Sequence, residues 1–290
     1  MNVALALELW IEALESEAKS KETIYNYRRF TRSLPELMPE LEAPEGALSL
    51  RRGLADYAKS HAPDSVRTVY VAWHAFFGWC VREGLLAESP MRSMRSPKVP
   101  ETTRDANRPA DMRAVLGQLA GQRTPIGLRN HALVAVLLDT GLRASELCRL
   151  TMDDVADGAL LVRLSKSGRP RIAPLGRESE KLLGRYLRYG RPALKPQDRS
   201  LIVNQFGQPI DRHGLRQILE RVGLKAGVRL SAHRLRHTWA SAHLRAGTPT
   251  ETLRRLGGWG VGSQMVVRYA HLTDDDLKAA QLRASPLDRM

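Results

Sequence analysis

The chain has 290 residues, of which 43% are hydrophobic and 26% are charged, and its formal net charge is +14 at pH 7. This composition is that of a globular protein, and the length predicts two domains. The large positive charge predicts a polyanionic partner, either nucleic acid or an anionic membrane surface.

The cysteines and the apolar segments exclude several classes of protein. Cys80 and Cys148 are too few for a disulfide framework or a thiolate zinc site, so we expect buried thiols in a reducing compartment. Glu8 and Glu12 interrupt the apolar residues at the N-terminus, which argues against a signal peptide. No apolar run approaches the roughly 20 residues of a membrane span. We therefore expect a cytoplasmic protein without a membrane partner.

The positive charge is concentrated in the later part of the chain. Residues 1–95 hold 12 Lys and Arg against 13 Asp and Glu, whereas residues 96–290 hold 33 against 18. An even distribution of charge would indicate only solubility. The asymmetry makes residues 96–290 the better candidate for contact with phosphate groups.

The N-terminal part of the chain has the apolar periodicity of amphipathic helices. The expected helices cover residues 3–18, 23–34, 49–60 and 64–83. Pro35 is expected to end the second helix, and Gly84 stands where a helix C-cap is expected. Residues 91–108 have no sustained apolar period and lie in a proline-bearing stretch, which predicts a linker.

The remainder is predicted to be mainly helical with one β-hairpin. The segment ALLVRLSKSGRPRIAPL (159–175) contains two β-like runs joined at residues 165–168. An apolar helix is expected to end at Thr140-Gly141, and the other expected helices cover residues 110–120, 177–189, 211–226, 231–246, 249–256 and 263–271. The sequence therefore predicts a mainly α fold of the α+β class: a helical N-terminal domain and a mostly helical second domain with a small antiparallel β-sheet.

The stretch SAHRLRHTWASAHL (231–244) concentrates histidines and arginines on one predicted helix. His233 and His237 share a helical face, as two zinc ligands do, but no third ligand is close by and the neighbouring arginines would repel a cation. A second interpretation is a surface helix whose charged residues are solvated. A third is a phosphate site, because His233 and Arg236 share a face and this pair of groups can bind a phosphate and move a proton.

Three motifs, in order along the chain, decide between these interpretations. They are TGLRASEL (140–147), HRLRH (233–237) and LGGWGVGSQMVVRYAHL (256–272). Together they resemble the tyrosine recombinase or integrase family. In that family the stretch 231–244 would form part of a phosphate clamp.

The N-terminal part of the chain carries the same resemblance. SKETIYNYRRF (20–30) and AFFGWCVREGLLAESPMRSMRSPK (75–98) are similar to the helical, SAM-like core-binding domain of the family. The resemblance implies the two-domain form of Xer-like and phage integrase-like enzymes: a core-binding, DNA-binding domain over 1–90, a linker over 91–108 and a catalytic domain over 109–290.

The resemblance also implies a catalytic set. Tyr269 would attack the scissile phosphodiester and form a 3′-phosphotyrosyl intermediate, with neither metal, ATP nor any cofactor. Arg143 and Arg236 would bind the non-bridging phosphate oxygens, since guanidinium groups match phosphate geometry. His233 would bind phosphate and transfer a proton, and Lys166, at the tip of the predicted hairpin, would protonate the departing 5′-oxygen.

Three further residues would support this set. Trp259 would buttress the phosphate site, and its ten-residue separation from Tyr269 is one residue longer than the family pattern. Glu146 would orient the guanidinium of Arg143; the alternative for this pair is an ordinary ion pair at the surface. His237 would have a structural or supporting role.

The predicted hairpin offers alternatives to a catalytic lysine. Most lysines at a hairpin tip are only solvated. Arg169 and Arg171 are the neighbouring groups that would contact the DNA backbone instead.

The function implied by the resemblance is site-specific recombination. The enzyme would cut and rejoin double-stranded DNA as a homotetramer on two DNA sites, with or without a partner recombinase, in integration, excision or resolution. Two alternatives are a DNA-binding relative that does not cut and a topoisomerase-like enzyme that relaxes DNA with the same tyrosine chemistry.

Overall fold

The computed structural model describes residues 1–99, 106–163 and 170–260, and it divides into two compact units, Met1–Thr103 and Arg104–Met290. The predicted hairpin tip with Lys166, the predicted helix 263–271 and Tyr269 lie outside the described residues.

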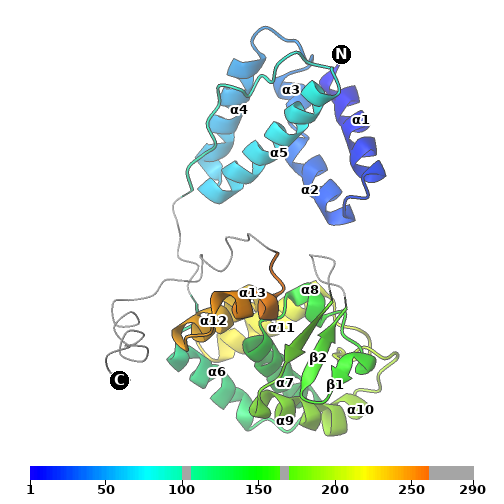
Figure 1. Ribbon diagram of the computed structural model, residues 1–290, viewed down its shortest axis with the longest axis vertical. Helices are drawn as coiled ribbons and strands as arrows, with labels where there is room; N and C mark the ends of the chain where they lie inside the picture. The colour runs from blue at the N-terminus through cyan, green and yellow to red at the C-terminus, as the bar shows by residue number, and fades with distance from the viewer. Residues whose placement is uncertain (100–105, 164–169, 261–290) are drawn as a thin grey trace, which may run out of the picture. The chain divides into compact units, whose positions relative to one another are not determined.

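The first unit is helical (Figure 1). Its helices are α1 (Val3–Ser16), α2 (Lys21–Thr31), α3 (Leu34–Leu37), α4 (Gly46–Ser60) and α5 (Pro63–Arg82). Side-chain caps begin the first two helices, since Asn2 accepts from the backbone N–H of Ala4 and Ser20 from that of Thr23. Pro35 does not simply end the second helix, as expected, but stands in the first turn of α3, where its missing N–H costs nothing.

Aromatic side chains form the core of this unit. Trp10, Trp73, Phe76 and Phe77 are all buried, and the ring centroids of Trp10 and Phe76 lie 5.5 Å apart. Nε1 of Trp73 donates to the carbonyl of Phe30 at 2.8 Å, so the polar atom of this buried ring is satisfied.

The two cysteines differ in exposure. Cys80 on α5 is buried, as expected, whereas Cys148 is only half-buried. Burial raises the pKa of the Cys80 thiol to about 12 and that of Cys148 to about 11, so both are protonated at neutral pH.

The second unit combines helices with a three-stranded sheet. Its helices before the sheet are α6 (Pro109–Ala120), α7 (Pro125–Thr140), α8 (Ala144–Leu147) and the 3₁₀ turn η1 (Met152–Asp154). The strands are β1 (Val155–Ala156), β2 (Ala159–Val162) and β3 (Arg171–Pro174). After the sheet come α9 (Arg177–Arg185), the π-helical turn η2 (Tyr186–Gly190), α10 (Arg191–Ala193), α11 (Arg212–Lys225), α12 (Ala232–Arg245) and α13 (Thr250–Gly257).

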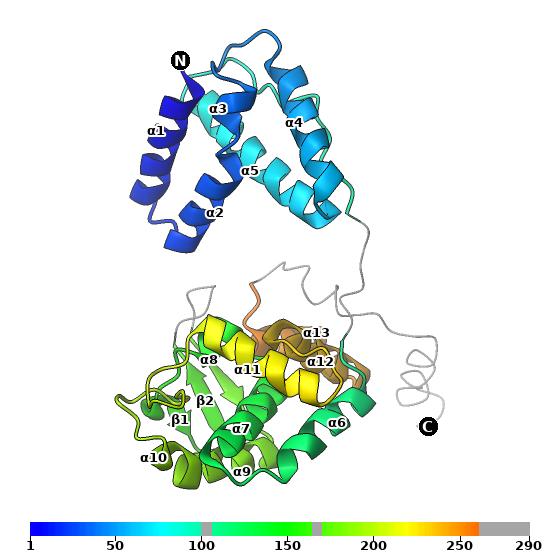
Figure 2. The ribbon, with the colours of Figure 1, turned by 180° about the vertical axis from the view of Figure 1, so that it is seen from behind.

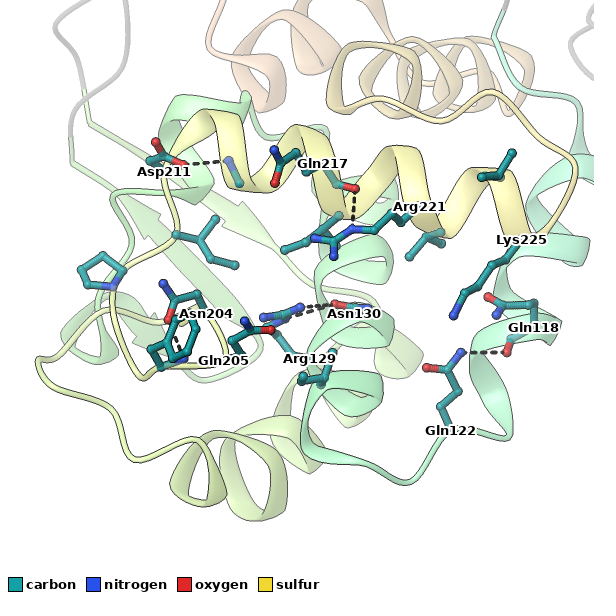
Figure 3. Close-up of a pocket in the computed structure, with 18 residues that line it drawn as sticks. Gln118, Gln122, Arg129, Asn130, Asn204, Gln205, Asp211, Gln217, Arg221 and Lys225 are labelled. Carbon is teal, nitrogen blue, oxygen red and sulfur yellow. Dashed lines mark hydrogen bonds between the residues drawn. The ribbon is translucent and has the colours of Figure 1, made fainter.

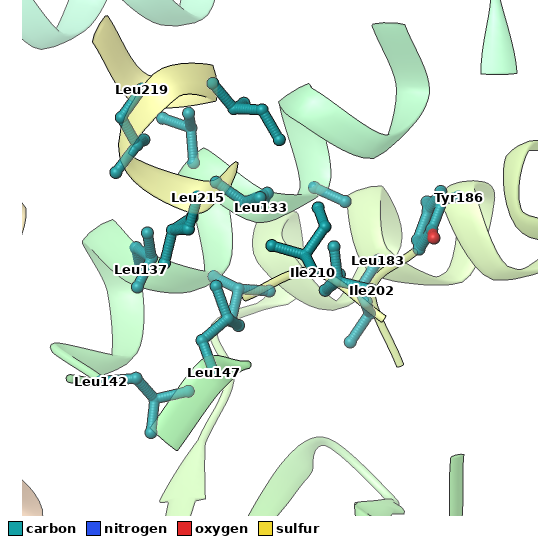
Figure 4. Packing of buried hydrophobic residues seen from close by; sticks show 14 of the residues in the cluster. Leu133, Leu137, Leu142, Leu147, Leu183, Tyr186, Ile202, Ile210, Leu215 and Leu219 are labelled. Atoms are coloured by element: carbon teal, nitrogen blue, oxygen red, sulfur yellow. The ribbon is translucent and has the colours of Figure 1, made fainter. Parts of the chain in front are cut away.

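Helix α7 lies at the centre of this unit. It packs against α6, α9, α11 and α12, and α11 crosses it on the side seen in Figure 2. Leu133 and Leu137 of α7 meet Leu215 and Leu219 of α11 in the buried core shown in Figure 4. An almost wholly apolar helix is what a central position of this kind requires.

The sheet is antiparallel in the order β1-β2-β3. The predicted hairpin is therefore confirmed, with Val162 opposite Arg171 and Leu160 opposite Ala173. Leu160, Val162 and Ala173 are buried in the core. Arg171 is the first residue of β3 and pairs with the last residue of β2.

The predicted fold class is confirmed: a mainly helical protein with a small antiparallel sheet. The single helix predicted over 177–189 is instead α9 followed by the π-helical turn η2. Within the described residues no helix is both long and apolar enough to cross a membrane.

Gly141 ends α7 where a side chain would not fit. Its φ of 58° lies in the left-handed region that favours glycine. A Cβ atom at this position would lie 2.2 Å from Cε3 of Trp239 on α12. The backbone at the end of α7 therefore packs directly on the Trp239 ring, which brings the Gly141 carbonyl close to α12.

We predict that Gly141→Ala lowers the free energy of unfolding by about 2–4 kcal/mol, because left-handed strain adds to overpacking against an aromatic ring. Urea denaturation measures the change. Gly117→Ala, inside α6 with open space around it, is the matched control and is expected to stabilise by up to about 1 kcal/mol. A Gly141→Ala protein as stable as the wild type would contradict the direct packing.

Candidate functional site

Helix α12 carries the central residues of the candidate site. Ser231 caps the helix by accepting from the backbone N–H of Arg234 at 3.2 Å. Arg236 and His237 are buried together with the apolar face of the helix, whereas His233 is exposed. The interpretation of a surface helix with solvated charges is therefore wrong for Arg236, which is only 4% exposed.

Backbone carbonyls anchor the buried guanidinium of Arg236. Nη1 donates to the carbonyl of Gly141 and Nη2 to the carbonyl of Gly257, both at 2.6 Å. The guanidinium also lies 4.6 Å from the ring centroid of Trp259, within the range of a cation–π contact. Because these partners are neutral, the anchoring leaves the positive charge of Arg236 uncompensated by them.

The Glu146 carboxylate accepts two hydrogen bonds from Arg143 at the start of α8. The backbone N–H of Arg143 donates to Oε2 of Glu146 at 2.9 Å, and Nη1 of Arg143 donates to Oε1 at 2.8 Å. The Glu146 side chain is only 2% exposed and that of Arg143 is 24% exposed. The alternative of an ordinary surface ion pair is therefore wrong, and the predicted contact between the carboxylate and this guanidinium is present.

Arg171 on β3 is the neighbour that the sequence did not place. Its Nη1 and Nη2 donate to Oε1 and Oε2 of Glu146 at 3.0 and 2.8 Å, and its side chain is 8% exposed. The interpretation of Arg171 as a contact for the DNA backbone is wrong for this structure, because its guanidinium is buried against a carboxylate.

The pattern of β3 explains the misplacement. In a strand, alternate residues share a face. An apolar Ile172 suggests that its own face is the buried one, but Ile172 is 62% exposed and Ala173 is buried. Arg171 therefore points inward with Ala173, a choice of face that only the register of the hairpin reveals.

Three successive backbone carbonyls at the end of α13 accept hydrogen bonds from Arg171, Arg236 and Arg143. Leu256 accepts from Nε of Arg171 at 3.0 Å, Gly257 from Arg236 at 2.6 Å, and Gly258 from Nη2 of Arg143 at 3.5 Å. The last carbonyls of a helix have no partner within the helix, and its C-terminus carries partial negative charge. The end of α13 is thus a natural anchor for cations, and we call these three side chains the arginine cluster.

The left-handed conformation of Gly258 sets the direction of its carbonyl group at the end of α13. Gly258 follows the helix with φ of 61°, in the left-handed region, and a Cβ there would approach Nη1 of Arg171 at 3.0 Å. The glycine turns the chain so that its carbonyl faces the same side as the helix end.

The ionisation of Glu146 follows from its neighbours. Burial acts to raise the pKa of this carboxyl group, but the hydrogen bonds and positive charges of Arg171 and Arg143 outweigh it and hold the pKa below the usual value. Glu146 is therefore a carboxylate at neutral pH. The arginine cluster and Glu146 together combine three positive charges with one negative charge.

His233 and His237 contact each other. Their Nε2 atoms lie 3.0 Å apart and the rings meet edge to face. One of these atoms must donate and the other accept, so the accepting ring is unprotonated at that nitrogen. This contact holds the exposed His233 ring against His237, one turn further along α12.

The Trp259 ring lies against the guanidinium of Arg236 in the arginine cluster. It is 5% exposed, and its ring centroid lies 6.0 Å from that of Trp239. Arg254 of α13 donates to the Trp259 carbonyl at 2.8 Å. The ring thus packs between α12 and the end of α13, on the Arg236 guanidinium.

The structure brings five predicted site residues into one neighbourhood with Arg236: Arg143, Glu146, His233, His237 and Trp259. Lys166 and Tyr269, the remaining two, lie outside the described residues. Among the described residues there is no group of three or more His, Cys, Asp or Glu side chains placed to hold a metal ion.

A separate pocket of about 540 Å³ lies between α6, α7, α11 and the segment 204–211 (Figure 3). Its walls combine polar and apolar side chains and include the buried Arg129, which donates to Oδ1 of Asn130 and to the carbonyl of Val203. None of the predicted site residues lines it. The candidate phosphate site is thus distinct from this pocket.

Comparison with known proteins decides the family. The model of the phage integrase family matches residues 109–276, more than half of the chain. The chain belongs to the phage integrase family. It is a tyrosine recombinase, an enzyme of site-specific DNA recombination, and neither a non-catalytic relative nor a topoisomerase-like enzyme is favoured by the matches.

Several tyrosine recombinases are similar to this recombinase along most of their length. XerC of a Mycobacterium species is 32% identical over 88% of this chain and 83% of its own. XerD of Listeria innocua is 30% identical over 75% of this chain and 74% of its own. XerA of Pyrococcus furiosus is 29% identical over 98% and 95% of the two chains.

Solved structures share the fold at low sequence identity. A lambda integrase dimer bound to a COC′ core site matches with a TM-score of 0.76 and 17% identity, over 93% of this chain and 95% of that chain. The Tn1549 transposon integrase in complex with transposon right end DNA matches with a TM-score of 0.75 and 19% identity, over 98% and 100%.

We predict that Glu146→Gln lowers the free energy of unfolding at pH 7 by about 3 kcal/mol, because it removes a buried carboxylate from between two guanidinium groups. A lowered pKa in the folded state means that this contribution is complete above pH 4.5 and is lost as the pH falls through the lowered value. Urea titrations from pH 7 to pH 3 should therefore show the difference between wild type and variant shrinking below pH 4.5.

Glu88→Gln is the control for this prediction, because the exposed Glu88–Arg92 pair is expected to contribute less than about 1 kcal/mol. A Glu146→Gln difference that stays constant down to pH 3 would show that the carboxylate charge does not stabilise the cluster.

Proposed function

We propose that this recombinase cleaves DNA with Tyr269 as its nucleophile and with Arg143 and Arg236 as the clamp on the scissile phosphate. The observation that carries the proposal is the anchoring of both guanidiniums at the end of α13, on the carbonyls of Gly257 and Gly258. Tyr269 follows this anchor in the chain, so the nucleophile and the carbonyls that hold the clamp belong to one continuous segment.

The positive charges of the clamp would stabilise the negative charge that develops on the phosphate during the reaction. A phosphodiester carries one negative charge and gathers more on its non-bridging oxygens as the tyrosine attacks. An arginine placed on such a transition state can contribute roughly 10³ to 10⁵ in rate. Arg236 fits this role because its described anchors are neutral carbonyls, and Arg143 because its side chain is partly exposed at the edge of the cluster.

Proton transfer is assigned to two further groups. A phenol has a pKa of about 10 and needs help to attack at neutral pH, and the departing 5′-oxygen needs a proton. His233 is exposed beside the clamp and is held by His237, which suits a group that binds phosphate and moves a proton. Lys166 is assigned as the acid for the 5′-oxygen, since it belongs to the loop between Val162 and Arg171, whose base lies at the cluster.

The chemistry conserves the energy of the DNA backbone bond. Attack by Tyr269 forms a 3′-phosphotyrosyl bond and releases a 5′-hydroxyl, and attack by a second 5′-hydroxyl reverses the step on a new partner. One phosphoester is exchanged for another in each step. We propose that the reaction therefore needs neither ATP nor a metal ion.

We propose that both domains bind DNA. We assign residues 1–90 as the core-binding domain, 91–108 as the linker and 109–290 as the catalytic domain. The excess of positive charge after residue 95 supports phosphate contact by the catalytic domain. Duplex DNA in the cytoplasm is the proposed substrate, and integration, excision or resolution of a mobile element or chromosome is the outcome.

We predict that the wild type forms a covalent adduct with a nicked suicide duplex without metal or ATP, and that Tyr269→Phe forms none while binding DNA normally. Arg143→Ala and Arg236→Ala should slow the adduct at least about 10³-fold. A denaturing gel of protein incubated with a pool of randomised duplexes detects the adduct, and sequencing the trapped DNA gives the site.

The matched control is the substitution of any other tyrosine, such as the exposed Tyr189→Phe, which should leave the adduct unchanged. An adduct that persists in Tyr269→Phe would contradict the assignment of the nucleophile. A wild-type protein that binds but never forms an adduct would favour DNA binding without cleavage.

The active assembly is proposed to be a homotetramer on two duplexes, with or without a partner recombinase. The segment after the nucleophile, TDDDLKAAQLRASPLDRM (273–290), carries apolar Leu277 and Leu282 for contact with a neighbouring protomer. Removing residues 275–290 should therefore reduce tetramers on DNA, measured by light scattering, and leave single-site binding intact. Unchanged assembly would contradict this role.

A further inference from the structure

We propose that Arg171 is a positioning residue for DNA cleavage: it occupies the carboxylate of Glu146 so that the positive charge of Arg143 remains available to the scissile phosphate. The inference rests on the proposed function, because it assigns Arg143 to the clamp. It concerns a residue that does not itself touch the phosphate.

The first support is the division of the Glu146 oxygens. Arg171 takes both of them in a fork, at 3.0 and 2.8 Å, whereas the guanidinium of Arg143 reaches only Oε1, at 2.8 Å. A two-pronged contact between guanidinium and carboxylate is the strongest geometry for such a pair. The carboxylate is thus mainly the partner of Arg171.

The second support is burial. The side chains of Glu146 and Arg171 are 2% and 8% exposed, whereas that of Arg143 is 24% exposed. The buried charges of Glu146 and Arg171 neutralise each other, and the more exposed guanidinium of Arg143 keeps its positive charge. Interactions between charges are stronger where water is excluded, so this neutralisation acts where it matters most.

The third support is the fixed position of Arg171 itself. Its Nε donates to the Leu256 carbonyl at 3.0 Å, and Arg171 is held in β3 opposite Val162. The guanidinium therefore has a defined place at the end of α13 and cannot move towards a bound phosphate without giving up three hydrogen bonds. Its role is exerted through Glu146.

The consequence of losing Arg171 follows from the charges. Within the described residues, Arg143 from α8 and Arg171 from β3 are the charged groups that face Glu146. Without Arg171, the buried carboxylate would pair fully with Arg143 and draw it away from the phosphate. Removing the carboxylate as well would release Arg143 again.

The experiment is a double-mutant cycle on single-turnover formation of the covalent adduct with a suicide duplex. Four proteins are compared: wild type, Arg171→Gln, Glu146→Gln and the double variant. We expect Arg171→Gln to slow the adduct about 100-fold with DNA affinity unchanged, as displacement of a catalytic group by about 1 Å can do. In the Glu146→Gln background, the same substitution should cost less than about 5-fold.

This rescue separates positioning from general structural support. A merely structural role would make the double variant at least as slow as Arg171→Gln, and that result would overturn the proposal. So would wild-type cleavage by Arg171→Gln, or a loss of rate explained by weaker DNA binding. If Arg171→Gln does not fold, the comparison of the double variant with Glu146→Gln still decides, since an equal rate supports the proposal and a 100-fold loss refutes it.

Arg199→Gln is the matched control, because Arg199 also forks a carboxylate, that of Asp153, but at an exposed site. It should cleave at the wild-type rate. If the wild type forms no adduct, just as Tyr269→Phe forms none, that result contradicts the proposed function rather than the role of Arg171.

Discussion

The candidate site depends on the three carbonyl groups that end α13. A helix leaves its last carbonyls without internal partners, and here Leu256, Gly257 and Gly258 offer them to arginines that come from β3, α12 and the start of α8. Elements distant in the sequence are thereby held at one point. The Trp259 ring in turn packs on the Arg236 guanidinium that this anchor holds.

The nature of the anchor decides what the arginines can do. A carboxylate partner would neutralise a guanidinium, whereas a carbonyl only orients it. Two carbonyls and an aromatic ring contact Arg236, and these neutral groups orient the guanidinium without neutralising it. Among residues 1–99, 106–163 and 170–260, Glu146 is the one carboxylate in contact with the arginine cluster, and Arg171 binds both of its oxygens. This arrangement suits the proposed clamp, because the transition state of phosphoryl transfer carries more than one negative charge.

Much of the fold could be predicted because the signals are local. Apolar periodicity located the helices, and two β-like runs around a turn located the hairpin, as β2 and β3 show. The expected contact between Arg143 and Glu146 in TGLRASEL is present, because an N-cap residue and the residue three positions later lie side by side at the start of a helix.

The parts that could not be predicted depend on long-range geometry. Glu146 and Arg171 are 25 positions apart, and the apolar Ile172 beside Arg171 points the wrong way for a simple alternation argument. Backbone carbonyls have no signature in a sequence at all. Only the close packing of Gly141 on Trp239 and the turn at Gly258 bring them within reach of the arginines.

The most direct test of this account is a crystal structure of the recombinase on a DNA site with vanadate in place of the scissile phosphate. The account predicts that Arg143 and Arg236 both donate to the non-bridging oxygens, with Tyr269 on the vanadium, while Arg171 stays on Glu146 and the Leu256 carbonyl. Direct contact between Arg171 and the vanadate, or an Arg236 that has left the α13 carbonyls to reach it, would contradict the central claim that the helix end holds the clamp in its active position.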